Sequence, residues 1–383
     1  MRISKYDDAS FAAVPEEARL ESLRRQIRLC AEAAPFYTYL KGAEMRGFDD
    51  LARLPFVTAE DIRRSGTRMV CVPASQIRRI VSLRSSGTSD VPKRLYFTEG
   101  DLERTVEFFR EGMGWMCSPG DKTAILLPCA SPWGVGQLLR EGLERLGAVP
   151  LCFGVPASPE AMDGIAEARP DVLVGMPWQV RLLALRNPEL RPKTVLLSAD
   201  YVPEAAYRTL PELWGCDVLC HFGMTETGYG GAVESPEHRG MALRRDELFA
   251  EVVDPETGDR LPFGETGELV LTTLRREAMP LIRCRTGDLV RMTDDGCIDR
   301  VFGRIAADRR IYDLQEALFP LPWLWDYRAA SGALLAHVSE DAPVCCTDIL
   351  AERLALAGLG GTPVTVGRLP RSAAAPLYTD KRI

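Results

Sequence analysis

A short loop rich in hydroxyl groups, with the sequence SSGTSDVPK, carries the residue types that can wrap a phosphate group. Gly87 lets a ligand approach the backbone closely. The hydroxyls of Ser85, Ser86 and Thr88, together with backbone N–H groups, can donate hydrogen bonds to phosphate oxygens. Lys93, at the end of the loop, can neutralise phosphate charge. The same composition is typical of a solvated turn before a strand, so the loop alone leaves both interpretations open.

A second segment, HFGMTETG, begins at residue 221 and follows a predicted buried strand. Open α/β sheets bind their ligands at the carboxyl ends of the strands, which is where this segment lies. Phe222 can present a flat face to a purine, Thr225 a hydroxyl to a phosphate, and Glu226 a hard oxygen ligand to Mg²⁺. Read alone, a glutamate here is more often a helix N-terminal charge than a metal ligand. The segment also contains His221, Gly223 and Met224.

A third segment, LIRCRTGD, ends in Asp288. We expect a strand over 281–285, followed by a turn that carries this carboxylate. A carboxylate can accept hydrogen bonds from both hydroxyls of a ribose, although Thr-Gly-Asp is also a common turn composition.

Signatures of several other kinds of site are missing from the sequence. The hydroxyl-rich loop has one glycine and its lysine is followed by arginine, which disfavours the Walker pattern of P-loop NTPases. The glycine pairs at 134–136 and 228–230 lack the third glycine of a dinucleotide-binding fingerprint. G-x-S-x-G is absent, and there are three histidines and no CxxC among eleven cysteines. We therefore expect neither a Ser-His-Asp hydrolase nor a structural zinc site.

Composition narrows the class of protein. The chain has 383 residues, 47 of them basic and 54 acidic, and its net charge of -7 has the wrong sign for a nucleic-acid partner. No apolar run approaches the ~20 residues of a membrane-spanning helix, and the N-terminal residues lack the apolar stretch of a secretory signal. We expect a cytoplasmic protein that binds neither nucleic acid nor membranes.

Five short apolar runs in the middle of the chain must position these segments. They begin at Thr123, Ala148, Asp171, Thr194 and Asp217. Between them lie stretches with helical start signals, such as those opening at Pro159 and Pro203. Short strands alternating with helices predict βαβ units, and hence an α/β fold with a doubly wound parallel sheet.

The flanking regions differ in character. After Gly240 we expect an antiparallel β subdomain, with strands over the ranges 248–253, 268–274, 281–285 and 298–302. Helices are expected over 15–39 and 348–356. The predicted division is a large N-terminal domain, 1–303, and a small C-terminal α+β domain, 304–383.

The three segments, in this order, resemble the AMP-forming adenylating superfamily of acyl-CoA synthetases and luciferases, and most closely its phenylacetate-CoA ligase branch. The resemblance covers roughly 54–304. Its motifs are LPFVTAEDIR, SSGTSDVPK, FGMTET, DPETG with GETGELVLTTL, MPLIRCRTGDL and a final Gly-Arg at 303–304. Each motif is weak alone, but chance agreement of all of them in family order is very improbable.

The resemblance implies a role for each of these positions. It assigns phosphate binding to Ser85, Ser86, Gly87, Thr88 and Lys93, adenine stacking to Phe222, and the phosphate and magnesium pair to Thr225 and Glu226. It assigns the ribose carboxylate to Asp288 and a ribose arginine near the hinge to Arg304. The nucleotide site implied in this way also includes Ser198, Ala199, Asp200, His221, Gly223 and Met224. The first three stand where relatives have Gly-Ala-Glu, and they keep an acid near the adenine edge.

The implied activity is that of an AMP-forming acyl- or aryl-CoA ligase that uses ATP, Mg²⁺ and coenzyme A. A substrate carboxylate attacks the α-phosphorus of ATP, and the coenzyme A thiol then displaces AMP. Resemblance favours an aromatic or other apolar acid, with Trp133, Trp178 and Tyr229 as candidate pocket residues. Core packing is an equally good interpretation of the two tryptophans. A homodimer is compatible with the sequence.

The C-terminal end departs from the family pattern. In relatives LPRS is followed within a few residues by a lysine that assists adenylation, whereas here AAAPL follows LPRS. Either Lys381 replaces that lysine or adenylation is slow while thioester formation persists, and we expect the second. Two other interpretations stay open: a catalytically weakened protein that binds ATP or an acyl adenylate, and an adenylating enzyme with an acceptor other than coenzyme A.

Overall fold

The computed structural model describes residues 14–370, apart from 84–91, 157 and 331, together with residue 373. The chain forms two compact units, each built from two separate stretches of sequence. Unit 1 comprises Met1–Trp115 and His221–Ile305, and unit 2 comprises Met116–Cys220 and Ala306–Ile383. The predicted division into 1–303 and 304–383 is a different partition and stays a prediction.

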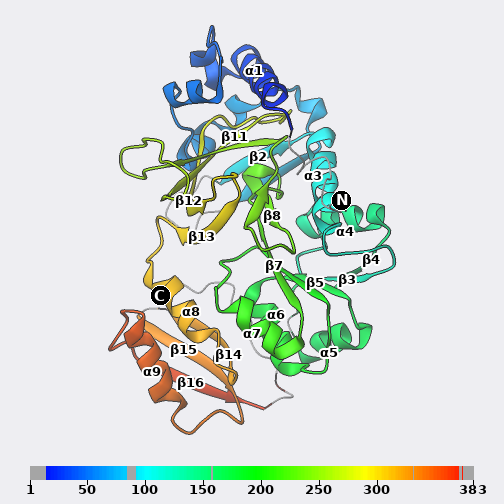
Figure 1. Ribbon diagram of the computed structural model, residues 1–383, viewed down its shortest axis with the longest axis vertical. Coiled ribbons are helices and arrows are strands. Elements are labelled where there is room, and N and C mark those ends of the chain that lie inside the picture. Colours follow the sequence, from blue (N-terminus) through cyan, green and yellow to red (C-terminus); the bar gives the residue numbers. More distant parts are fainter. Residues whose placement is uncertain (1–13, 84–91, 157, 331, 371–372, 374–383) are drawn as a thin grey trace. The chain divides into compact units, whose positions relative to one another are not determined.

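Unit 2 contains the predicted parallel sheet (Figure 1). Its strands are β3 (Lys122–Ile125), β4 (Val149–Cys152), β5 (Val172–Gly175), β6 (Thr194–Leu197) and the first part of β7 (Asp217–Phe222). They pair in the order β7-β6-β5-β3-β4, every pair parallel. The helices between them are α4 (Val135–Leu146), α5 (Pro159–Ala168), α6 (Pro177–Arg186) and α7 (Ala206–Trp214). The doubly wound α/β prediction is therefore confirmed, because helices follow the strands wherever the apolar runs alternate with helical spacing.

The second stretch of unit 2 is a small α+β module. It consists of α8 (Arg310–Leu318), β14 (Leu324–Ala330), β15 (Ala333–Ser339), α9 (Cys346–Leu356) and β16 (Val364–Leu369). Strand β15 pairs antiparallel with β14 and parallel with β16, and α9 supplies the crossover that a parallel pair requires. Its apolar residues share one core with those of α5, α6 and α7, including Leu182, Leu210, Leu318 and Leu350.

Arg181 on α6 is fully buried in this shared core. It donates to the carbonyl oxygens of Phe319, Leu321 and Leu324, and its Nη1 lies 2.6 Å from the last of these. These carbonyls belong to the segment that leads from the end of α8 into β14. Arg181 thus ties the two stretches of unit 2 together. Burial lowers the pKa of Arg181 to about 9, which leaves the guanidinium charged at neutral pH.

Unit 1 is built on an antiparallel sheet (Figure 1). Its strands are the end of β7, β8 (Ala232–Glu234), β9 (Met241–Leu243), β10 (Leu248–Val253), β11 (Thr266–Thr273), β12 (Cys284–Met292) and β13 (Ile298–Arg304), in the order β10-β11-β12-β13-β9-β8-β7. The antiparallel β subdomain is confirmed. A separate antiparallel pair joins β1 (Arg79–Leu83) to β2 (Lys93–Phe97).

The helices of unit 1 are α1 (Glu16–Ala33), α2 (Ala59–Ser65) and α3 (Glu99–Met113). Short 3₁₀ segments lie at Pro35–Leu40, Phe48–Arg53, Gly66–Met69, Ala74–Gln76 and Thr225–Thr227. Helix α3 begins with a capping box: Thr98 accepts from the Asp101 N–H at 3.0 Å, and Asp101 accepts from the Thr98 N–H at 3.1 Å. The sequence TEGD at 98–101 therefore fixes where α3 starts.

One local prediction is wrong. The strand expected over 281–285 instead begins at Cys284, and the RTGD segment expected as a turn lies within it. Gly287, with φ of +76°, and register shifts in the ladder on both sides let the strand continue through this composition. Asp288 therefore stands on a strand, directly opposite Arg304 of β13.

Among the described residues, no helix combines the length and the apolar character needed to cross a bilayer.

Candidate active site

Lys93 and Glu226 form an ion pair, which brings two of the predicted site residues together. Lys93 is the first residue of β2, and Glu226 lies in the 3₁₀ segment that follows β7. The Lys93 Nζ donates to the Glu226 Oε1, and both side chains are largely buried, with 17% and 8% exposed. The phosphate-loop residues Ser85, Ser86, Gly87 and Thr88 lie outside the described residues.

The turn that carries Glu226 has a tightly specified backbone. A Cβ atom at position 223 would lie 2.1 Å from the Tyr229 carbonyl oxygen. Only glycine therefore allows the backbone at 223 and the backbone at 229 to lie this close together. Gly228 ends the turn with φ of +71°. The Thr227 hydroxyl donates to the Met224 carbonyl at 2.9 Å. The GMTETG sequence thus favours the turn that carries Thr225 and Glu226 at the end of β7.

His221 and Phe222 occupy opposite faces at the end of β7, as successive strand residues do. The His221 ring packs against Phe108 and Phe109 of α3, with centroids 5.7 and 6.0 Å apart. Burial lowers the pKa of His221 to about 4, so the imidazole is neutral at pH 7. Phe222 is half-buried. The nucleotide-binding roles of both residues stay predictions.

Asp288 and Arg304 form the second pair that the fold brings together. The Arg304 Nη1 lies 2.9 Å from the Asp288 Oδ1, with the arginine side chain 55% exposed and the carboxylate 9% exposed. Burial raises the pKa of Asp288, and the Arg304 charge and hydrogen bond oppose that rise. A carboxylate on a strand beside an exposed guanidinium is a suitable acceptor for ribose hydroxyls.

The remaining predicted segment, Ser198–Asp200, belongs to unit 2 and directly follows β6. The Ser198 N–H donates to the Gly175 carbonyl at 3.0 Å, and Ala199 has φ of +67°. A non-glycine residue in the left-handed region is uncommon and is concentrated at functional sites. This conformation supports a ligand-binding role for the segment, which stays a prediction.

The three aromatic candidates for an acyl pocket differ in their surroundings. Trp178 lies in the core of unit 2 and its Nε1 donates to Gln315 at 3.0 Å, which favours the core interpretation. Tyr229, in unit 1, has φ of +72° and stacks on Phe97 with ring centroids 6.4 Å apart. Trp133 has φ of +58°. Tyr229 and Trp133 therefore stay candidates.

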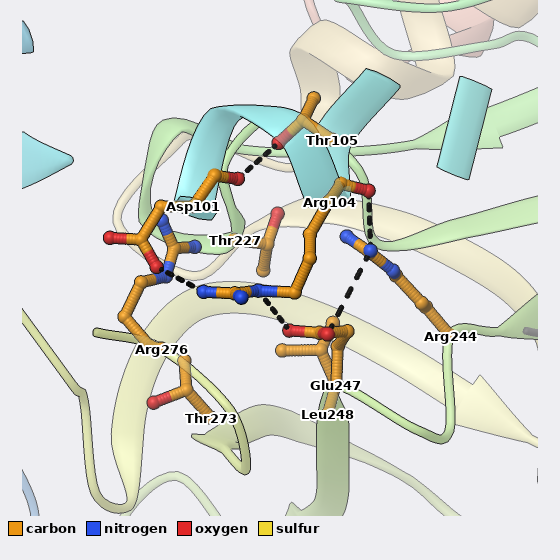
Figure 2. A pocket seen from close by; sticks show the side chains of 9 residues that line it. All are labelled: Asp101, Arg104, Thr105, Thr227, Arg244, Glu247, Leu248, Thr273 and Arg276. Carbon is orange, nitrogen blue, oxygen red and sulfur yellow. Dashed lines mark hydrogen bonds and ion pairs between the residues drawn. The ribbon is translucent and has the colours of Figure 1, made fainter. Parts of the chain in front are cut away.

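Sequence reasoning missed a group of charges, most of them buried, that contacts the Glu226 turn (Figure 2). Asp101 and Arg104 of α3, Glu247 just before β10, and Arg244 and Arg276 from two loops converge around a cavity of about 10 Å³, room for about one water molecule. A capping-box aspartate and arginines in polar segments carry no sequence signal of burial. The TEGD capping box could have located Asp101, but nothing in the sequence pairs it with Arg276.

We predict that Asp288→Asn weakens ATP binding about 10- to 100-fold, because a charged acceptor for the ribose hydroxyls is lost. The pKa of Asp288 is higher in the folded protein than in the unfolded chain, so ionising this carboxyl opposes folding. Its contribution to stability is therefore lost as the pH rises from the ordinary pKa of an aspartate through the raised one. Asparagine removes this cost, and we expect an equal or higher melting temperature at pH 7. Calorimetry with ATP and thermal unfolding measure the two effects.

Asp299→Asn is the matched control, since Asp299 is a more exposed carboxylate of the same sheet paired with Arg291. It should leave ATP affinity unchanged. Wild-type affinity in the Asp288 variant would remove this carboxylate from the nucleotide site.

Comparison with known proteins identifies the family of the chain. Residues 80–274, about half of the chain, match the family model described as AMP-binding enzyme. The chain is 32% identical over 298 residues to the phenylacetate-coenzyme A ligase of Thermus thermophilus, covering 72% of this chain and 65% of that protein. It is 27% identical over 293 residues to the enzyme of the same name from Aromatoleum evansii, covering 72% and 66%. The chain thus spans about two thirds of the length of these relatives.

Solved structures show the same fold. The chain matches 2-hydroxyisobutyryl-CoA ligase in the postadenylation state with a TM-score of 0.78 and 22% identity, covering 100% of this chain and 93% of that one. It matches a benzoate CoA ligase from Burkholderia xenovorans with a TM-score of 0.52 and 18% identity, covering 76% and 65%.

Proposed function

Because the chain belongs to the family of AMP-binding enzymes, we propose that it is an AMP-forming acyl- or aryl-CoA ligase. In the first half-reaction a substrate carboxylate oxygen bonds to the α-phosphorus of ATP, and the bond from that phosphorus to the β-phosphate bridging oxygen breaks. Pyrophosphate leaves with the bonding electrons. In the second, the sulfur of coenzyme A bonds to the acyl carbon, and AMP leaves. The observation that carries the proposal is the pairing of Lys93 with Glu226 beside β7.

Electrostatics explains why this chemistry needs Lys93. The attacking carboxylate is already ionised at pH 7, so no general base is required, and the obstacle is the approach of an anion to a polyanion. Two unit charges ~4 Å apart interact by about 4 kcal/mol at an effective dielectric near 20. A buried ammonium at the end of the phosphate loop offsets that repulsion and stabilises charge on the transferring phosphorus.

Glu226 suits a magnesium ion that enters with ATP. Mg²⁺ in nucleotide sites is held by one or two carboxylates plus phosphate oxygens and waters. In the part of the chain that the structure describes, no group of three His, Cys, Asp or Glu side chains forms a dedicated metal site. A single buried carboxylate, that of Glu226, fits a site in which the protein and the phosphates of ATP hold the ion together. When bound, the ion would screen the charges of the phosphates.

The nucleoside half of ATP would contact the other predicted site residues. Phe222 would stack on adenine, and a nucleotide-binding role for Ser198–Asp200 stays a prediction. Asp288, oriented by Arg304, would accept from the ribose hydroxyls. Coenzyme A is the proposed acceptor, as the names of the curated relatives indicate for those proteins.

The acid we propose is aromatic or otherwise apolar. Two relatives are named for phenylacetate, and one structural neighbour is named for benzoate. Tyr229, half-buried and stacked on Phe97 beside the Glu226 turn, offers an aromatic surface for such a group. Lys381, the proposed alternative to the missing C-terminal lysine, lies outside the described residues.

We predict that the protein catalyses ATP–pyrophosphate exchange with at least one acid from a panel of phenylacetate, benzoate and short aliphatic acids. With coenzyme A present, mass spectrometry should detect the matching thioester. Supplying a presynthesised acyl adenylate tests the second half-reaction alone: fast thioester formation beside slow exchange would indicate a weak first step. Failure to exchange pyrophosphate with any acid, together with no ATP binding by calorimetry, would refute the proposal.

A further inference from the structure

Two carbonyl groups of the Glu226 turn, one in its middle and one directly after its end, accept hydrogen bonds from side chains elsewhere in unit 1. The Arg276 Nη2 donates to the carbonyl oxygen of Glu226 itself at 3.1 Å. The Thr105 hydroxyl of α3 donates to the carbonyl of Gly228 at 2.8 Å. A Cβ on Gly228 would lie 3.1 Å from both donors, so the turn fits closely against them. The backbone of Glu226 is therefore fixed from outside its own loop.

Arg276 is itself held in place by buried partners. Its side chain is enclosed, and the guanidinium carbon lies 5.0 Å from the centre of the Phe97 ring, the last residue of β2. Burial lowers its pKa, and the nearby Asp101 and Glu247 carboxylates oppose this effect. A buried arginine without such carboxylates would be strongly unfavourable. Figure 2 shows Arg276 beside Asp101, beneath the first turn of α3.

Asp101 joins the two segments that meet at this point. Its carboxylate accepts from the Glu277 N–H at 2.9 Å and from the Ala278 N–H at 3.0 Å, directly after Arg276. It also accepts from Arg104 at 2.8 Å. The carboxylate is thus anchored to the backbone that carries Arg276 as well as to α3. This leaves the Arg276 side chain little freedom to turn away from the Glu226 carbonyl.

We propose that Arg276, oriented by Asp101, is a positioning residue that sets the backbone of Glu226 and so places the Glu226 carboxylate against Lys93. The contact that Arg276 makes is with the backbone carbonyl of Glu226, so the role proposed for it is to position that residue. The inference rests on the proposed function, in which Lys93 and Glu226 hold ATP with Mg²⁺. It adds that this pair depends on a buried charge in a loop that precedes β12.

The test compares Arg276→Met with Arg276→Lys in the full-length protein. Hydrogen exchange of the peptide 222–230 should speed up at least about tenfold in the methionine variant without any ligand, because the Glu226 carbonyl loses its charged donor. ATP binding by calorimetry at fixed Mg²⁺ should weaken by at least about the same factor. Arg276→Lys keeps the charge but not the fork of the guanidinium, and should restore stability more than it restores exchange protection and affinity.

Arg283→Met controls for the general cost of deleting a buried arginine. Arg283 lies in the same unit and pairs with Glu251 through two contacts of 3.1 Å. We expect it to lower the melting temperature while leaving exchange at 222–230 and ATP affinity at wild-type values. If Arg276→Met does not fold, Arg276→Lys decides by the same two measurements.

Wild-type exchange at 222–230 in a folded Arg276 variant would overturn the inference, as would an equal change in Arg283→Met. If the wild-type protein bound no ATP, the proposed function would fail instead. Hydrogen exchange alone would then decide whether Arg276 positions the turn.

Discussion

Lys93→Met lowers the rate of ATP–pyrophosphate exchange about 10²- to 10³-fold, the loss expected when one preorganised donor to a developing charge is removed. Methionine keeps the unbranched apolar part of the side chain and removes the ammonium. The Glu226 carboxylate, 8% exposed, then also loses its partner. Glu226→Gln should reduce exchange by a similar factor and raise the Mg²⁺ concentration at half-maximal rate. The assay is pyrophosphate exchange at saturating acid across a Mg²⁺ series.

Combining Lys93→Met with Glu226→Gln in one protein tests whether the two residues act together or independently. Because Lys93 and Glu226 are in contact, the two losses should combine to less than their product. Lys122→Met is the control, since Lys122 is an exposed lysine at the start of β3 that donates to the Ala168 carbonyl at 3.2 Å. It should exchange at the wild-type rate. Wild-type Mg²⁺ dependence in Glu226→Gln would show that the carboxylate has only a structural role.

Arg181→Met is expected to destabilise the protein by about 3 to 5 kcal/mol, the usual cost of removing one partner from a buried charged cluster. Three backbone carbonyls, those of Phe319, Leu321 and Leu324, lose the hydrogen bond from the guanidinium, although that of Leu321 still accepts from the Leu324 N–H. Asp326, which is fully buried nearby, loses a compensating charge. Urea unfolding followed by tryptophan fluorescence reports on this core, because Trp178 and Trp325 lie in it.

Two further variants test that explanation. Arg191→Met, at an exposed arginine of the same unit, should change stability by less than about 0.5 kcal/mol. Arg181→Met combined with Asp326→Asn should recover part of the loss, since no unpaired charge is then left buried. A single Arg181 variant as stable as the wild type would show that packing alone joins the two stretches of unit 2.

The regular spacing of apolar runs was enough to predict the parallel strands, and the range 248–253 was predicted to the residue as β10. Periodicity and turn composition are local properties, which is why they can be recovered from one sequence. The RTGD segment is a case in which local composition predicts the wrong structure. Its composition is that of a turn, but hydrogen-bonded pairing with the strands on both sides of β12 prevails over this local preference.

Contacts between distant charges could not be predicted in this way. The order of motifs indicated a nucleotide site that includes Lys93 and Glu226, and the structure places the two in contact. Arg276, by contrast, occurs in sequence surroundings typical of a solvated arginine, and the apolar stretch around Arg181 does not indicate which acceptors its guanidinium binds. Whether an arginine is buried depends on acceptors more than 100 positions away in one case and 50 in the other. No local pattern encodes such pairings.

The shared core of unit 2 also affects how the chain folds during synthesis. The stretch containing α6 and α7 leaves the ribosome before the module of α8, β14, β15 and α9 that packs on it, and residues 221–305 come in between. At about 5 to 20 residues per second this gap lasts roughly 4 to 17 s. During that time the module's share of the common core is absent, and Arg181 lacks the three carbonyls that it binds in the folded protein. The nascent chain therefore passes through a state with an exposed apolar face, the kind of surface that chaperones bind, and a ribosome stalled after Ile305 would hold it there.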